Sequence, residues 1–69
     1  MTQKELLYVE DAIGHETSVI AYLTDAINNL EDEELISYLE DVVKKHENTK
    51  KKLIKKLEDN TNEWSRNNG

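Results

Sequence analysis

Apolar residues recur along the first part of the chain at alternating steps of three and four residues. This spacing is the heptad pattern of a helix that buries one seam. Only Glu16 interrupts the seam, and Ala12, Val19 and Ala26 form a second row beside it. A face this wide is typical of a helix that contacts two neighbours, as in a four-helix bundle. The pattern predicts a first helix over about residues 2–29. The seam positions are Leu6, Val9, Ile13, Ile20, Leu23, Ile27 and Leu30.

A second seam of the same kind follows and is interrupted only by His46. Its predicted members are Leu35, Leu39, Val42, Thr49, Leu53 and Leu57, with Ile36, Val43 and Ile54 alongside. Thr2 with Glu5 matches a capping box, and Asp32 is a suitable N-cap for the second helix. We therefore predict a second helix over about 32–60 and a flexible polar tail over 61–69, which has no apolar period. Because the linker is short, the helices of this single domain, 1–60, should be antiparallel neighbours.

The predicted register places the two interrupting residues opposite each other. In an antiparallel hairpin that turns near Glu31, the numbers of facing residues sum to about 62. The rule pairs Glu16 with His46 inside the hairpin. It also places Glu10 and Asp11 beside Lys51 and Lys52, which would balance charge within the chain.

Glu16 and His46 also fall near the midpoints of their helices. Two hairpins packed antiparallel and centre to centre would bring two copies of each residue together. Two carboxylates and two imidazoles suit a divalent transition metal such as iron, manganese or zinc. The alternative is a metal-free hydrogen bond that sets the register. His15 and Glu47 are each either an additional ligand or a solvated neighbour of the site.

Composition limits the classes of protein further. The chain has 69 residues, no Cys, no Pro and two Gly, which disfavours disulfide scaffolds, zinc fingers and turn-rich β folds. No apolar run is long enough to span a membrane, and the start lacks the apolar region of a signal peptide. A chain this short buries little core alone, so a partner or a metal is expected. A cytoplasmic location fits a chain without cysteine.

Charge is divided along the chain, although the formal net charge is −6. Residues 1–43 hold eleven acids and one base, whereas residues 44–69 hold eight bases and four acids. The lysines of 50–52 and 55–56 are interpreted as a solvated helix face, because the net sign is wrong for generic phosphate binding. We expect no nucleic-acid or membrane partner. A homodimer is expected, and a partner helix on the wide apolar face is the alternative.

The segment 11–53 resembles the helix pair of the ferritin-like, rubrerythrin-type superfamily, and it is also similar to the ferritin-like spore coat proteins of the F type. The features that carry this resemblance are Ala12, Glu16 and Tyr22 on one helix, the acidic loop 31-EDEEL-35 and the central His46. The resemblance implies that each chain supplies half of a four-helix bundle. It also implies that Glu16 is the first-helix glutamate and that His46 is the histidine of Glu-x-x-His.

Val43 stands where that motif has its glutamate, so the resemblance implies a single metal, or none, in place of a bridged di-iron site. The sequence thus predicts an all-α hairpin that dimerises into a ferritin-like four-helix bundle and binds a metal through Glu16 and His46. A metal-free structural or interaction module, with spore-coat association as one setting, is the alternative. No catalytic residue is predicted, since the chain has no phosphate loop, nucleophile elbow or Cys–His pair.

Overall fold

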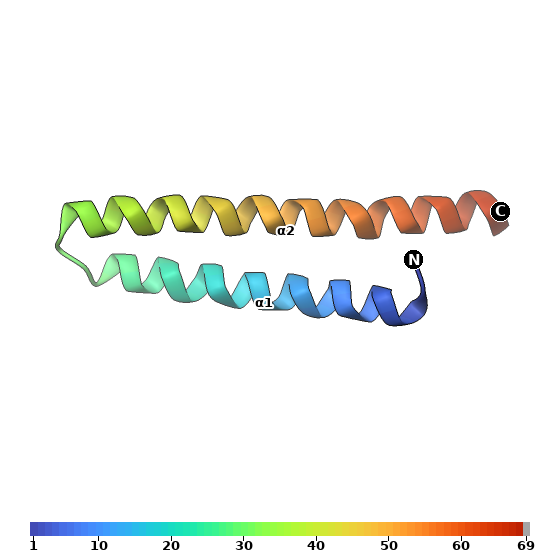
Figure 1. The fold of residues 1–69 in the computed structure, drawn as a ribbon, viewed down its shortest axis with the longest axis horizontal. Helices are drawn as coiled ribbons and strands as arrows, with labels where there is room; N and C mark the ends of the chain where they lie inside the picture. Colours follow the sequence, from blue (N-terminus) through green and yellow to red (C-terminus); the bar gives the residue numbers. More distant parts are fainter. Residues whose placement is uncertain (69) are drawn as a thin grey trace.

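The computed structural model describes the backbone of residues 1–68 and the side chains of residues 1–60. It contains two helices, α1 (Gln3–Asn28) and α2 (Glu33–Asn68). They run antiparallel side by side and are joined by a short turn, with the N-terminus lying beside the later part of α2 (Figure 1). The prediction of an all-α helical hairpin is confirmed. Neither helix, over the described positions, has an apolar stretch that could cross a membrane.

The start of α1 is held by the predicted capping box. The Thr2 N–H donates to Glu5 Oε1 at 2.7 Å, and the Glu5 N–H donates to Thr2 Oγ1 at 3.1 Å. These bonds satisfy backbone donors that a helix leaves without partners at its first turn. They also lower the pKa of the Glu5 carboxyl, because the ionised form accepts the Thr2 N–H most strongly.

The start of α2 is capped as the sequence predicted. Asp32 Oδ1 accepts the N–H of Leu35 at 3.0 Å. Glu33 and Glu34 occupy the first turn, where the helix dipole favours negative charge. The two N-caps therefore fix where each helix begins.

The second helix is longer than predicted. Its backbone is helical through Asn68, beyond the predicted end near Asn60. No proline or glycine occurs between Glu33 and Asn68, and the Asn, Thr and Ser residues there lower helix propensity without blocking the helix. The sequence also predicts a flexible tail over 61–69. Gly69 and the side chains of 61–68 lie outside the described residues, so this prediction is not tested.

The seam of α1 forms as predicted, and that of α2 is rotated. Leu35 is 42% exposed and Thr49 is exposed, although both were predicted seam positions. Ile36 and Lys50, one residue further along, are half-buried in their place, and Val43 is half-buried beside the predicted Val42. Two neighbouring rows of apolar residues exist on α2, and contact with α1 decides which of them faces inward. The half-buried positions of α2 within residues 33–60 are Ile36, Leu39, Val42, Val43, His46, Lys50, Leu53, Leu57 and Asn60.

The hairpin is elongated and has no closed core. Its radius of gyration is 16.1 Å and its extents are 54 × 16 × 13 Å. A compact chain of this length would have a radius of gyration of roughly 11 Å. No side chain within residues 1–60 is fully buried. One hairpin therefore leaves a large part of its apolar surface in water.

Removing the cap of α2 should destabilise the fold. We expect Asp32→Ala to lower the free energy of unfolding by about 1 kcal/mol, because the Leu35 N–H loses its acceptor. Asp41→Ala is the matched control, since Asp41 is an exposed carboxylate within the same helix and caps nothing. Urea unfolding at one fixed protein concentration measures both variants. Equal effects of the two substitutions would contradict this role for Asp32.

Gly14 offers a stabilising substitution. A Cβ atom at this helical position would meet nothing within 4 Å. Gly14→Ala should therefore raise the free energy of unfolding by up to about 1 kcal/mol, the difference in helix propensity between the two residues. The same urea experiment tests this, and a destabilised variant would show that another surface approaches Gly14.

Candidate functional site

The polar contact predicted at the centre of the hairpin is present. Glu16 on α1 and His46 on α2 are hydrogen-bonded through Oε2 and Nδ1. The Glu16 side chain is 14% exposed and the His46 side chain is 33% exposed. The predicted register is thus confirmed at the level of these two residues. Apolar seam residues lie on both sides of the pair along each helix, so this polar layer is flanked by hydrophobic contacts.

The chemistry of the pair depends on which ring nitrogen of His46 is hydrogen-bonded to Glu16. A carboxylate only accepts hydrogen bonds, so Nδ1–H of the imidazole donates to Glu16. The Nε2 lone pair of His46 and the second oxygen of Glu16 are then left to bind another group. Histidines that bind metals through one nitrogen commonly donate from the other to a carboxylate, which holds the ring in place. The pair therefore offers an oriented imidazole and a carboxylate, and no third candidate ligand joins it within residues 1–60.

The other two candidate ligands do not join the pair. His15 and Glu47 are both exposed. No group of three or more His, Cys, Asp or Glu side chains that could hold a metal ion occurs within residues 1–60. Residues 1–60 of one hairpin thus bring together Glu16 and His46 without a third such side chain, and a complete metal site would require further ligands.

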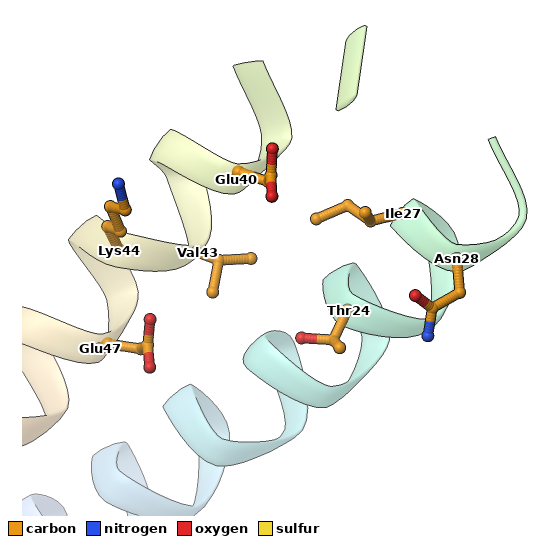
Figure 2. A pocket seen from close by; sticks show the side chains of 7 residues that line it. All are labelled: Thr24, Ile27, Asn28, Glu40, Val43, Lys44 and Glu47. Atoms are coloured by element: carbon orange, nitrogen blue, oxygen red, sulfur yellow. The ribbon is translucent and has the colours of Figure 1, made fainter. Parts of the chain in front are cut away.

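Glu47 instead lines a shallow groove along one side of the hairpin (Figure 2). The groove has a volume of about 320 Å³. Val43 and Ile27 point toward one another across it, while Lys44 points away from α1. Val43, at the position where the Glu-x-x-His motif has a glutamate, thus forms an apolar contact surface here. The lining residues are Thr24, Ile27, Asn28, Glu40, Val43, Lys44 and Glu47.

The groove residues Glu40 and Lys44 were not singled out from the sequence. The one signal that could have found them is their spacing, because Glu40, Lys44 and Glu47 recur at helical intervals beside Val43. Their mixed charges give the groove no single ligand preference, and it carries no assigned role.

Among the side chains of residues 1–60, the oppositely charged residues predicted to lie beside one another on the two helices form no direct ion pair. The ion pairs among the side chains of residues 1–60 are His46 with Glu16, and Lys55 with Asp59 at 3.4 Å within α2. Glu10 and Asp11 form none with Lys51 or Lys52, so these charges do not meet in direct ion pairs. Exposed pairs between long side chains gain little free energy in water, and ordering them costs entropy. Lys51 and Lys52 therefore stay exposed to solvent beside the acidic first helix.

No protein-family model, curated protein or solved structure matches this chain. The ferritin-like resemblance therefore still depends on the residues that carry it: Ala12, Glu16, Tyr22, the acidic loop 31–35 and His46.

Substitutions at the polar layer should show how the pair contributes to stability. We expect Glu16→Ala alone to cost about 1–3 kcal/mol, because it leaves the His46 donor without a partner in a half-buried position. Replacing both residues by leucine should be neutral or stabilising, since no unpaired polar group remains. Glu10→Ala, on the same helix but exposed, is the control. A double variant less stable than Glu16→Ala would contradict this reasoning.

Proposed function

We propose that this protein is a homodimeric four-helix bundle of ferritin-like type that binds a divalent transition metal at its centre. In this assembly two hairpins pack antiparallel and centre to centre. The ligands would be Glu16 and His46 of both copies. The observation that carries the proposal is the Glu16–His46 contact between two mainly apolar seams.

The energetic cost of the polar pair supports a role beyond packing. Withdrawing a carboxylate and an imidazole from water is unfavourable unless hydrogen bonds or a cation compensate it. The internal hydrogen bond uses one atom of each group, and a metal would use the remaining nitrogen and oxygen. A dimer would also supply the core that one hairpin lacks, since none of the side chains of residues 1–60 is fully buried.

The ligand set fits iron, manganese or zinc. Imidazole and carboxylate are ligands that these ions accept, and two copies would supply four such groups. Glu16 would either bind the ion or hold the His46 ring in the orientation that binds it. Because Val43 stands where the Glu-x-x-His motif has its glutamate, the remaining ligands suit one ion per dimer. His15 and Glu47 are the residues of this chain closest in sequence to the pair that could add a ligand.

The second candidate is a metal-free structural module with the same architecture. The hydrogen bond between Nδ1 and Oε2 favours it, because the pair is satisfied inside one chain and can fix the register by itself. A cytoplasmic setting, or association with a spore coat as the resemblance implies, belongs to both proposals.

Metal analysis distinguishes the two candidates. Apoprotein is dialysed separately against Fe²⁺ under anaerobic conditions, Mn²⁺ and Zn²⁺, and bound metal is measured by mass spectrometry. We expect about one ion per two chains, and a loss of affinity of at least about tenfold in Glu16→Gln and in His46→Ala. Glu10→Gln, an exposed glutamate on α1, should bind as the parent does. Absence of stoichiometric binding, or equal binding by all variants, would leave the metal-free module.

The dimer is tested separately by sedimentation equilibrium. The expected mass is twice the 8.0 kDa of one chain. A folded species at the mass of a single chain would overturn the four-helix bundle, whatever the outcome of the metal experiment.

A further inference from the structure

We propose that the second copy docks on the groove side of the hairpin, where a row of alternating charges on α2 meets the same row of the other copy. The groove side is the flank that carries the groove of Figure 2 and a second groove beside it. This inference rests on the proposed homodimer. It adds the surface that makes the contact, the helices that become neighbours and the charged residues that pair.

The two grooves follow one another along the same flank. The second has a volume of about 290 Å³, and Glu47 lines both. Each groove has an apolar residue from each helix: Ile27 and Val43 line the first, and Ile20 and Ile54 line the second. Ile54 is 36% exposed in the single hairpin. Covering this flank would therefore remove apolar side chains of both helices from water, which is favourable.

Charged residues of alternating sign run along α2 on this flank, and we call them the charge row. They share one side of the helix because their steps are four, three and four residues. The charge row consists of Glu40, Lys44, Glu47 and Lys51. Glutamate and lysine at such spacings can pair within a helix, but within residues 1–60 no member of the row forms an ion pair. These charges are therefore free to pair with another molecule.

The charge row is complementary to its own reverse. Its midpoint falls beside His46, at the level of the polar layer. When two copies of α2 pack antiparallel about this point, Glu40 of one copy is level with Lys51 of the other, about 8 Å from the centre. Lys44 is level with Glu47 of the other copy, about 2 Å from the centre. The two-fold symmetry repeats each contact, so all four facing pairs have opposite signs.

Lys50 adds a second reason to expect a partner on this flank. It lines the second groove and is half-buried, yet it forms no ion pair with a side chain of residues 1–60. Partial burial of a charge is unfavourable when no opposite charge accompanies it. In the antiparallel contact, Lys50 lies within about 1.5 Å of the level of Glu40 of the other copy. The same carboxylate can therefore serve Lys50 and Lys51.

Apolar residues of this flank also come level in that arrangement. Ile13 of one α1 and Ile20 of the other both lie about 5 Å from the level of the polar layer. Ile36 of one α2 lies about 14 Å from the centre, and Ile54 of the other lies about 13 Å from it. The contact that pairs the charges thus also pairs isoleucines on both helices.

The opposite flank of α2 lacks this complementarity. From Leu35 to Lys56 its two rows hold three lysines and no acid. The lysines are Lys45, Lys52 and Lys56. An antiparallel contact on that flank would bring the Lys45 residues of both copies to nearly the same level, where they would repel. The signs of the charges therefore select the groove side.

Charge also determines which helices become neighbours. With the turns of both copies at one end, α2 would face α1 of the other copy. Between Asp11 and Asp25, α1 has only one Asp, Glu, Lys or Arg, the Glu16 already bonded to His46, so the charge row would lack partners. With the turns at opposite ends, α2 faces α2 and every charge of the row is paired. Because the row matches its own reverse, a second copy fits this flank better than an unrelated helix.

Charge reversal at the two ends of the row tests the contact. Glu40→Lys and Lys51→Glu should each raise the dimer dissociation constant at least about tenfold, because each variant meets like charges in its own dimer. An equimolar mixture of the two should associate about as tightly as the parent. In the mixed dimer the two reversed residues face each other with opposite signs, and so do the two unreversed ones. Sedimentation equilibrium over a range of concentrations measures this, and circular dichroism checks that each variant is folded.

Matched controls lie one residue further along α2. Asp41→Lys and Lys52→Glu change the net charge by the same amounts at exposed positions that line neither groove. Each should change the dissociation constant less than about twofold, and mixing them should have no further effect. Equal effects of the controls and of the row variants would show that net charge, and not this contact, governs association.

Cysteine cross-linking tests the face independently. The chain has no cysteine, so a single Glu47→Cys gives one thiol per copy in the groove. In the proposed contact the two thiols lie about 5 Å apart along the helix axis, and a mild oxidant should link most of the dimer through a disulfide. Lys45→Cys is closer to the centre but lies on the opposite flank, so it should remain mostly unlinked.

The outcomes separate this inference from the proposed function. Preferential linking of Lys45→Cys in a species of dimer mass would overturn the groove side and leave the dimer. Failure of the Glu40→Lys and Lys51→Glu mixture to regain affinity would overturn the pairing of the charge row and also leave the dimer. A single-chain mass for the parent would overturn the dimer and this inference together.

Discussion

The hydrogen bond between Glu16 and His46 is the constraint on which the rest of this structure depends. Apolar seams alone allow two helices to slip past each other by a heptad, because every heptad offers a similar surface. A polar pair in the seam removes that freedom, since any slip would leave a half-buried carboxylate or imidazole without a partner. The pair lies at the midpoint of α1, so it sets the register equally for both halves of the hairpin.

A hairpin fixed in this way remains incomplete. Two helices side by side can shield one seam but cannot enclose it, and none of the side chains of residues 1–60 is fully buried. The same geometry that half-buries Glu16 and His46 also leaves atoms of both groups available. A second hairpin would therefore complete the hydrophobic core and the polar layer together. Structural stability and ligand binding would then depend on the same contact.

Charge has a different role from the polar layer. The acidic turn suits the N-terminus of α2, where Glu33 and Glu34 face the positive end of the helix dipole. Within residues 1–60, the lysines of 44–56 form one ion pair with a side chain, Lys55 with Asp59, and none with Glu10 or Asp11. Segregated charges of this kind contribute little to the fold of one chain. They can determine which way round two chains meet, because complementarity acts most on orientation and specificity.

The sequence by itself determined both helices, their N-caps and the level at which Glu16 meets His46, because capping chemistry and heptad spacing are local properties of the chain. It did not determine the rotation of α2, where Ile36, Val43 and Lys50 are half-buried while the predicted seam positions Leu35 and Thr49 are exposed. Adjacent rows differ by a small rotation, and only contact with α1 selects between them. The tertiary structure also decided that His15 and Glu47 stay apart from the polar pair, because His15 is exposed and Glu47 lines the groove on one side of the hairpin. Periodicity fixes which residues share a face, and packing fixes where that face points.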